Sequence, residues 1–368
     1  MNKAKLDVAP LSSWLNDLDG PLIISGPCGA ETQEQVLTTA SELSKLNRVR
    51  VFRSGIWKPR TRPNAFEGAG RPGLQWLQQV KKQFGFLTTV EVANAQHVEE
   101  AITNGVDILW IGARTTVNPF SVQEIADVLR GTNIPVMVKN PIHDDLQLWI
   151  GALERVNQAG IKKLIAVHRG FYTHDQRKYR NPPHWEIPIE LKTYFPDLPL
   201  ICDPSHICGN KQFLQEVSQK ALDLSFDGLM IESHFDPESA LSDKQQQLKP
   251  AELGALLAEL VIRTSQSTSV EFISKLEQLR KIVDEVDEEI IIQLAKRMQL
   301  IEHIGEYKRE NNITILQLER WLHILQTRTA SAEAKSISKE FIQKLLKLMH
   351  KESIRKQTKV MNERVEKQ

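Results

Sequence analysis

The sequence lacks the features that mark secreted and membrane proteins. Only three cysteines, Cys28, Cys202 and Cys208, occur among 368 residues, too few and too odd in number for a disulfide framework. No run approaches the roughly 18 apolar residues that span a bilayer, and the N-terminus lacks the apolar core of a signal peptide. We therefore expect a cytoplasmic protein that makes no contact with a membrane.

The sequence also lacks an excess of charge of either sign. Lys and Arg number 47 against 46 Asp and Glu, which gives a formal net charge of +1. This balance excludes a protein that coats nucleic acid and argues against an acidic disordered tail. Hydrophobic residues make up 41% of the chain, enough for a sizeable core, and the length favours two domains or one large barrel with an appendage.

Residues 20–262 repeat a short apolar run, a polar loop and an amphipathic stretch, with a period of about 30 residues. Eight of the apolar runs are typical of strands: residues 22–28, 49–55, 86–92, 108–114, 135–140, 163–170, 200–206 and 228–234. Apolar strands that alternate with helices imply a parallel sheet, and eight of them predict a (β/α)8 (TIM) barrel over residues 1–262. An open, doubly wound sheet is the alternative.

Beyond residue 271 the chain has a single glycine, Gly305, and no proline, while apolar residues recur at helical spacing. This pattern predicts an all-helical domain over residues 271–368, preceded by a polar, Ser/Thr-rich linker at 263–270. Its first helix would run for about 40 residues, or about 60 Å. Because its own domain is too small to cover that length, we expect a partner chain or the barrel to cover the rest.

Residues that bind transition metals fall at the ends of three predicted strands. They are Cys28 after the first, His206 after the seventh, Glu232 near the end of the eighth, and Asp243 in the following loop. Barrel active sites lie at the carboxyl ends of the strands, and this mixed donor set suits Mn, Fe, Co or Zn. Taken singly, each residue has an ordinary alternative as a core, cap or surface residue. Cys202 and Cys208 are the weaker thiol candidates.

The remaining strand ends carry cations. These are Arg53, Lys58 and Arg60 after the second strand, Arg114 after the fourth, Lys139 after the fifth and Arg169 after the sixth. Converging cations repel one another unless an anion neutralises them, and Arg and Lys are standard receptors for phosphate and carboxylate. Any one of them is also open to an alternative role as a solvated surface residue. Together with the metal ligands they predict carbon–carbon bond or phosphoryl chemistry on small anionic substrates.

Two cations interrupt the apolar stripe of the long predicted helix. On a helical projection Arg297 and Lys308 fall within about 40° of Ile290 and Ile304. Charges on an apolar face are costly unless they serve a ligand, although long side chains can also reach past such a face to solvent. Arg280 lies about 100° from Arg297, at the edge of the stripe, and is expected to face a different cavity.

The motifs SGPC, FRSGIWKPRTRP, IGAR, VMVKN, HRG, DPSH and ESHFDPESALSD resemble those of the short bacterial 3-deoxy-D-arabino-heptulosonate 7-phosphate (DAHP) synthase family, over about residues 10–262. The resemblance implies metal-dependent condensation of phosphoenolpyruvate with erythrose 4-phosphate, the first step of the shikimate pathway. It implies one divalent metal per barrel, manganese before Fe, Co or Zn, held by Cys28, His206, Glu232 and Asp243. It assigns phosphoenolpyruvate to Arg53, Lys58, Arg114, Lys139 and Arg169, with Lys58 also catalytic, and the aldose phosphate to Arg60 and Thr61.

The KPRT motif at residues 58–61 separates this family from its sister, 3-deoxyoctulosonate phosphate synthase. The sister reaction, on arabinose 5-phosphate, is the weaker alternative. The chain departs from the family pattern where Asn140 and Pro141 follow Lys139 and where His168 precedes Arg169. The group that handles the water added at C2 is left open between a carboxylate and a metal-bound water.

The segments LRKIVDEVDEEI, KRM, EYK, LER and ESIRKQ resemble the all-helical chorismate mutase family, over about residues 271–358. The resemblance implies rearrangement of chorismate to prephenate in a homodimer formed through this domain. It assigns the substrate to Arg280, Arg297, Lys308, Arg320, Ser353 and Gln357, with the first three catalytic and Arg280 serving the partner chain. Gln317 and Trp321 stand where carboxylates often flank the Arg of this motif. A regulatory domain that binds prephenate and inhibits the barrel, without turnover, is the alternative.

Overall fold

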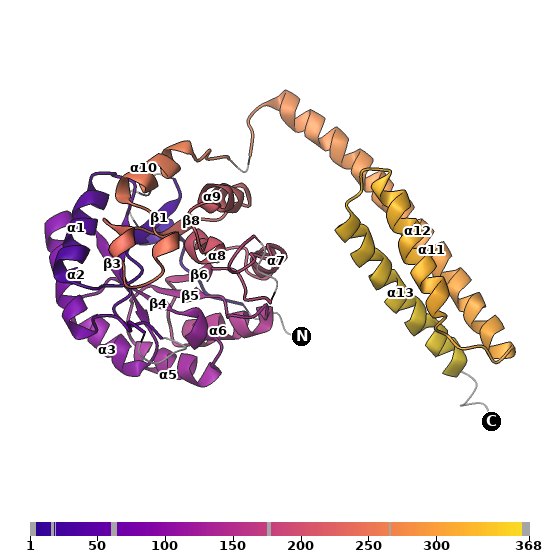
Figure 1. Cartoon of the computed structure of the whole chain (residues 1–368), viewed down its shortest axis with the longest axis horizontal. Coiled ribbons are helices and arrows are strands. Elements are labelled where there is room, and N and C mark those ends of the chain that lie inside the picture. Colours follow the sequence, from indigo (N-terminus) through magenta and orange to yellow (C-terminus); the bar gives the residue numbers. More distant parts are fainter. Residues whose placement is uncertain are drawn as a thin grey trace. The chain divides into compact units, whose positions relative to one another are not determined.

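The structure, a computed structural model, describes residues 5–15, 18, 20–59, 65–174, 178–264 and 266–362. The chain divides at residue 265 into two compact units (Figure 1). The first unit contains every described strand, and the described part of the second contains helices only. The predicted fold class, a barrel followed by an all-helical domain, is therefore confirmed.

The first unit is built around eight parallel strands that close into a barrel in the order of the sequence. They are β1 (Leu22–Gly26), β2 (Val51–Arg53), β3 (Leu87–Val92), β4 (Ile108–Ile111), β5 (Val136–Lys139), β6 (Leu164–His168), β7 (Leu200–Cys202) and β8 (Gly228–Glu232). β1 pairs with β8, with Gly26 opposite Glu232, which excludes the open sheet. Each predicted run contains one strand. Arg53, Lys139 and Glu232 are the last residues of their strands, and the other predicted metal and substrate ligands of this unit lie in the segments that follow the strands.

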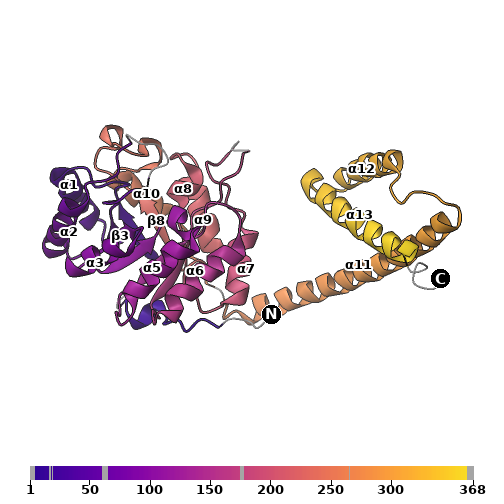
Figure 2. The ribbon, with the colours of Figure 1, turned by 90° about the horizontal axis from the view of Figure 1, so that it is seen from below.

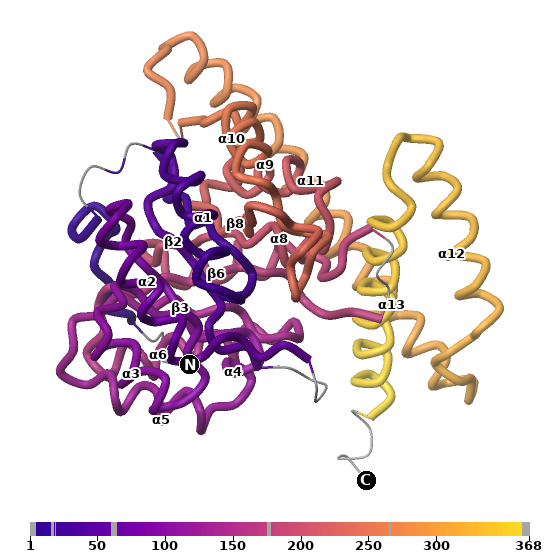
Figure 3. The backbone as a smooth tube through the Cα atoms, turned by 60° about the vertical axis from the view of Figure 1, so that its left-hand side comes forward, coloured from indigo at the N-terminus to yellow at the C-terminus, as the bar shows by residue number. Residues whose placement is uncertain are grey.

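An outer ring of helices surrounds this barrel (Figures 1 and 3). Its members are α1 (Gln33–Ser44), α2 (Arg71–Phe84), α3 (Ala95–Thr103), α5 (Pro119–Leu129), α6 (Leu146–Gln158), α7 (Glu186–Tyr194), α9 (Leu214–Asp223) and α10 (Pro250–Glu259). Two short helices, α4 (Ala113–Thr116) and α8 (Pro204–Cys208), follow directly on the ends of β4 and β7. Several of these helices begin where a short polar side chain accepts an amide hydrogen from the first turn, as Thr32, Asn94, Asn118, Asp145 and Asp203 do. These caps are a local reason why each loop turns into a helix.

The core of the barrel has two layers because successive strand residues point to opposite faces. Ile23 and Phe52 face the helices, whereas Ile24 and Val51 belong to a separate cluster inside the barrel. Leu15, close to the short 3-10 helix η1 (Leu11–Ser13), belongs to the same inner cluster. Since apolar side chains fill the interior, the candidate polar residues gather at the carboxyl ends of the strands and in the segments that follow them.

The described part of the second unit consists of three helices, α11 (Val270–Glu310), α12 (Leu318–Glu333) and α13 (Lys339–Asn362) (Figure 2). α11 has 41 residues, as long as predicted, and begins at Val270 because the Ser269 side chain caps it by accepting from Phe272 N–H. A Cβ at Gly305 would lie 3.2 Å from Gln357 Cγ, so the small residue lets α11 and α13 pack closely. None of the described helices is both long and apolar enough to cross a membrane.

Candidate active site

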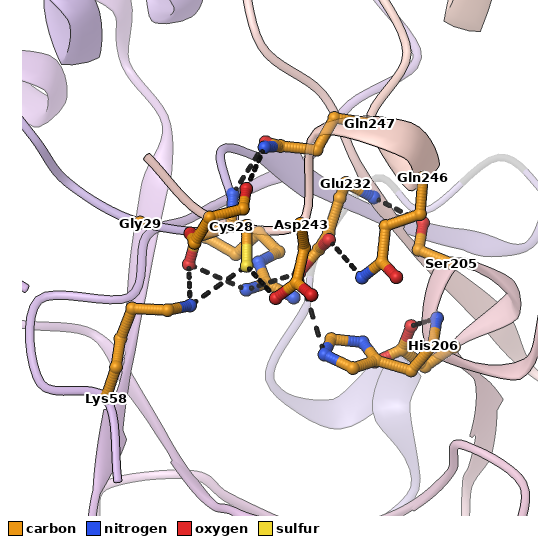
Figure 4. Close-up of polar contacts among 12 residues, drawn as sticks. Cys28, Gly29, Lys58, Ser205, His206, Glu232, Asp243, Gln246 and Gln247 are labelled. Carbon is orange, nitrogen blue, oxygen red and sulfur yellow. Dashed lines mark hydrogen bonds and ion pairs between the residues drawn. The ribbon is translucent and has the colours of Figure 1, made fainter. Parts of the chain in front are cut away.

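The four predicted metal ligands lie at one rim of the barrel, at or beyond the carboxyl ends of β1, β7 and β8 (Figure 4). Cys28 Sγ is 3.1 Å from Asp243 Oδ2, and His206 Nε2 is 3.8 Å from Glu232 Oε1. Among the described residues no three His, Cys, Asp or Glu side chains yet converge closely enough to hold an ion as they stand. The donors therefore meet in two pairs, which would have to draw together around a metal.

The close approach of these loops depends on a glycine. Gly26, the last residue of β1, has a φ of +148°, and a Cβ there would overlap the carbonyl oxygen of Arg53. Only glycine readily adopts this backbone conformation, and it lets the ends of β1 and β2 come together. As a result Arg53 NH2 lies 3.4 Å from the carbonyl oxygen of Cys28.

Two predicted substrate-binding cations contact the candidate ligands directly. Lys58 Nζ lies 2.9 Å from Cys28 Sγ and donates to Cys28 O at 2.8 Å. Arg53, which is 2% exposed, places NH2 3.2 Å from Glu232 Oε1. The guanidinium of Arg53 also lies 5.0 Å from the ring centroid of Trp110, inside the barrel. These contacts balance the negative charge of the buried carboxylate.

The protonation of the site follows from burial and from these charges. Burial, reinforced by the charge of Glu232, raises the pKa of Cys28 to about 12, although Lys58 acts in the opposite direction. Burial would also raise the pKa of Glu232, but the charges of His206 and Arg53 hold it below its usual value. For Asp243 burial is likewise outweighed, by His206 and by Arg180, and the pKa is lowered. The site thus combines ionised carboxylates with a protonated thiol whose proton a divalent cation would displace.

The orientation of His206 is set by Asp203, a residue that the sequence analysis did not single out. Asp203 Oδ1 accepts from His206 N–H at 3.1 Å, while Oδ2 lies 2.8 Å from His206 Nδ1 and 2.7 Å from Lys139 Nζ. Burial would raise the pKa of Asp203, yet the charges of His206 and Lys139 hold it well below its usual range. Carboxylates commonly hold one ring nitrogen of a metal-binding histidine in this way, which leaves Nε2 to face Glu232.

A second group of cations lies around Arg169, which follows β6. Burial, together with the charges of Arg180 and Arg114, lowers the pKa of Arg169 to about 10, although Asp203 opposes the shift. Arg169 N–H donates to the Asn140 side chain at 2.7 Å, which gives one of the two unusual residues after Lys139 a role in holding this loop. Because the charges of Arg180 and Arg114 disfavour the charged form of Arg169, a bound anion would be favourable beside these three guanidinium groups.

Arg180 was missed by the sequence analysis because it lies in the long loop before α7, outside any motif. Its NH1 donates to Asp243 Oδ1 at 2.8 Å and to Gln246 Oε1 at 3.1 Å. Arg60 and Thr61, the predicted ligands of the aldose phosphate, lie outside the described residues. Cys202 and Cys208 are buried in the outer core between strands and helices, among apolar side chains.

The donor set fits a divalent transition metal. It offers one sulfur, one imidazole nitrogen and carboxylate oxygens, a mixture that suits such ions better than Mg²⁺ or Ca²⁺. Glu232 Oε1 is buried and, within the described part of the chain, accepts no hydrogen bond that meets normal geometry. Arg53 NH2 lies 3.2 Å from this oxygen and balances its charge, and a metal ion would supply the bond that Oε1 lacks. The residues present are therefore compatible with the predicted metal.

The second unit encloses a cavity of roughly 680 Å³ between its three helices. Predicted ligand residues that line it are Arg297, Lys308, Arg320, Ser353 and Gln357, and two cations not predicted, Arg328 and Lys335, join them. Its described lining contains no Asp or Glu. Arg297 NH1 donates to Ser353 Oγ at 2.8 Å, and burial lowers the pKa of both Arg297 and Lys308. The cavity is therefore suited to an anionic ligand.

Two of the unusual positions noted in the sequence also line this cavity. Trp321 stacks on His350 with ring centroids 3.9 Å apart and planes 8° from parallel, and Gln317 lies at the start of α12. Arg280 does not line the cavity of its own chain; it is exposed on α11, about 25 Å along the helix from Arg297. One chain therefore does not bring Arg280 together with the other predicted ligands.

Comparison with known proteins gave two family matches. A model of the DAHP synthetase I family matches residues 15–268, and one of the chorismate mutase type II family matches residues 279–358. Phospho-2-dehydro-3-deoxyheptonate aldolase of Thermotoga maritima is 31% identical over 226 residues, which cover 61% of this chain and 64% of that protein. The chain thus spans less than two thirds of this relative.

The chain is also similar to an aldolase with a different name and to a solved structure. 2-Dehydro-3-deoxyphosphooctonate aldolase of Wolinella succinogenes is 26% identical over 264 residues, covering 65% of this chain and 98% of that protein. The crystal structure of the Thermotoga maritima DAHP synthase matches with a TM-score of 0.60 at 29% identity, covering 67% of this chain and 70% of that one. Because its family model spans more than half of the sequence, the chain belongs to the DAHP synthetase I family, and it carries in addition a chorismate mutase type II domain, a combination that supports a bifunctional enzyme.

Proposed function

We propose that the first unit condenses phosphoenolpyruvate with erythrose 4-phosphate to give DAHP. The observation that carries this proposal is the ring of cations, Arg53, Lys58, Lys139 and Arg169, beside the thiol, imidazole and carboxylate donors of one barrel rim. The cations bind the phosphate and carboxylate of the enol substrate and orient it for attack, which lowers the entropic part of the barrier. Lys58 supplies positive charge next to the reacting carbonyl group.

A divalent ion, manganese before Fe, Co or Zn, would be held by Cys28, His206, Glu232 and Asp243. When bound, it supplies Lewis acidity toward the aldehyde oxygen of the second substrate. Asp203 keeps the His206 imidazole oriented, and Lys139 bonds the same carboxylate from the substrate side. Arg60 and Thr61 are the proposed ligands of the aldose phosphate.

The decisive experiment follows consumption of phosphoenolpyruvate by the full-length chain. With erythrose 4-phosphate we expect turnover that EDTA abolishes and added Mn²⁺ restores. The likeness to 2-dehydro-3-deoxyphosphooctonate aldolase makes arabinose 5-phosphate the second candidate substrate, and it is tested in parallel. Higher kcat/KM with the five-carbon aldose, or turnover that EDTA leaves intact, would contradict the proposal.

We further propose that the second unit rearranges chorismate to prephenate. The reaction is pericyclic and needs no nucleophile or base, so cations that hold the reactive conformer and stabilise charge on the ether oxygen suffice. Arg297, Lys308 and Arg320 line a cavity without a described carboxylate, which supports this role. Arg297→Ala should lower kcat/KM for chorismate about 100-fold or more, whereas Lys296→Ala, at the exposed neighbouring position, should not.

The regulatory alternative uses the same cations without turnover. It is favoured if prephenate raises the melting temperature of the chain and slows the barrel reaction while chorismate is not consumed. We propose that prephenate binding also inhibits the barrel when turnover is present, which makes the second unit both an enzyme and a sensor. Unchanged DAHP formation at saturating prephenate would refute this coupling.

We infer that two copies of the chain dimerise through the helical unit. The first half of α11 exposes a run of large apolar side chains, among them Leu279, Ile282, Val283, Val286 and Ile290, each 48–56% exposed. Burying them against a second copy would stabilise an otherwise marginal helix and would bring the partner's Arg280 toward the cavity. A mass independent of concentration and equal to one chain in light scattering would contradict the dimer.

The remaining proposals concern organisation and place in the cell. We propose that residues 1–262 and 271–368 are the two domains and that 263–270 is the linker, which limited proteolysis should cut first. We propose a cytoplasmic location because a reducing compartment keeps Cys28, Cys202 and Cys208 as free thiols. Oxidising the purified chain should therefore lower metal binding, and a reductant should restore it.

A further inference from the structure

Two adjacent glutamines after β8 are buried beside the candidate metal ligands. Gln246, the last residue of the 3-10 helix η3 (Lys244–Gln246), is 1% exposed, and Gln247 is fully buried, whereas Gln245 is exposed. A buried side-chain amide is costly unless its donors and acceptors are matched. For Gln246, the contacts that offset this cost indicate what the residue does.

Gln246 links two parts of the site. Its Nε2 donates to Glu232 Oε2 at 2.7 Å (Figure 4). Its Oε1 accepts from Arg180 NH1 at 3.1 Å. The same Arg180 nitrogen donates to Asp243 Oδ1 at 2.8 Å. Gln246 and Arg180 therefore form one hydrogen-bonded chain that ends on one oxygen of each candidate carboxylate ligand.

The other oxygen of each carboxylate faces the remaining candidate ligands. Glu232 Oε1 lies 3.8 Å from His206 Nε2 and also 3.2 Å from Arg53 NH2. Asp243 Oδ2 lies 3.1 Å from Cys28 Sγ. The backbone of Glu232 is held as well, since its N–H donates to Ser205 Oγ at 2.9 Å. The contacts with Gln246 and Arg180 thus select which oxygen of each carboxylate points toward the thiol and the imidazole.

This inference rests on the metal site of the proposed function. We propose that Gln246 is a positioning residue that, with Arg180, holds Glu232 Oε2 and Asp243 Oδ1 and so presents Glu232 Oε1 and Asp243 Oδ2 to the ion. Only an amide suits this position, because it donates to a carboxylate at one end and accepts from a guanidinium at the other. A carboxylate at 246 would meet Glu232 as a like charge, and an apolar residue would leave Glu232 Oε2 without its donor.

The test measures metal binding by the full-length chain, after removal of bound metal with a chelator. Gln246→Met keeps the length of the side chain and removes both hydrogen bonds, and Gln245→Met is the matched control on the exposed neighbour. Cd²⁺ is the probe, because its bond to a thiolate has a charge-transfer absorption in the ultraviolet and so reports on Cys28 independently of activity. Mn²⁺ affinity is measured on the same variants by equilibrium dialysis.

We expect Gln246→Met to weaken both Cd²⁺ and Mn²⁺ binding about 10- to 100-fold, with wild-type affinity for Gln245→Met. Thermal unfolding of the metal-free proteins checks that Gln246→Met is folded. If it is not, Gln246→Asn takes its place, because it keeps a buried amide that is one methylene too short to span both partners. Wild-type affinities in a folded variant at 246 would overturn the proposal for Gln246.

Failure of the underlying metal site gives a different result. In that case the wild-type chain shows no Cd²⁺ absorbance, or shows one that Cys28→Ser leaves unchanged. That outcome overturns the assignment of the ligands, and with it the role of Gln246. Binding that needs Cys28 but is indifferent to residue 246 overturns the positioning role alone.

Discussion

His168 should make the stability of the barrel fall steeply with acid. It is the last residue of β6, it is fully buried, and its ring lies 5.4–6.4 Å from the ring centroids of Trp149, Phe171, Trp185 and Phe226. Burial in these surroundings lowers the pKa of His168 to about 3. The folded chain therefore keeps this imidazole neutral over most of the acidic range.

The sign of the effect follows from proton linkage. Below about pH 6.5 the unfolded chain binds a proton at His168, whereas the folded chain does not until about pH 3. Acid therefore favours the unfolded state between these two values. From pH 7 to pH 5 the linkage removes about 2 kcal/mol from the free energy of unfolding, and at pH 4 about 3 kcal/mol.

The assay compares the chain with His168→Phe, which keeps an aromatic ring in the cluster and cannot titrate. Urea unfolding is followed by tryptophan fluorescence, because six of the seven tryptophans precede residue 262. Between pH 7 and pH 5 the wild type should lose about 2 kcal/mol relative to the variant. The exposed His174 provides the control. The difference in free energy of unfolding between His174→Phe and the wild type should be the same at pH 7 and at pH 5. Parallel pH profiles for wild type and His168→Phe would refute the reasoning.

Three further predictions concern the two sites and the helical surface. Cys28→Ser should abolish metal binding and DAHP formation while chorismate turnover persists, because the residues of the two sites belong to separate units; equal loss of both in a folded protein would count against this. Trp321→Ala removes the stack on His350, which is worth about 0.5–1.5 kcal/mol. The steady-state KM for chorismate should therefore rise about 2- to 10-fold, and an unchanged KM would contradict this prediction. Ile290→Asp should shift the chain to monomers in light scattering, and an unaltered dimer would show that this face is not the interface.

The parts of the fold and site that the sequence predicts are those that depend on a repeating pattern. Eight apolar runs define the strands, and barrel topology then brings the residues after them to one rim, as with Cys28 and His206. Helical periodicity likewise puts Arg297 and Lys308 on one face, and both line the cavity.

The parts that could not be predicted depend on the path of loops. Arg180 reaches Asp243 from the loop between β6 and α7, and Gln246 turns back onto Glu232 through η3. Neither contact follows from a repeating pattern or a fixed spacing in the sequence, so neither could be predicted. Asp203 had a local signal, since it lies three residues before His206 and caps α8, but its second partner, Lys139, comes from a distant strand. Long-range pairings of this kind become visible only when the backbone is known.

The pairing of β1 with β8 has a consequence for how the chain folds. Cys28 and Asp243 are separated by 215 residues, and they meet only when the first and last strands of the barrel join. Partly folded chains, however many helices they have formed, lack the complete set of donors. Contacts between such distant residues form slowly. In stopped-flow refolding, tight binding of Mn²⁺, which needs the complete set of donors, should therefore appear only in the slowest phase and so report when the barrel closes.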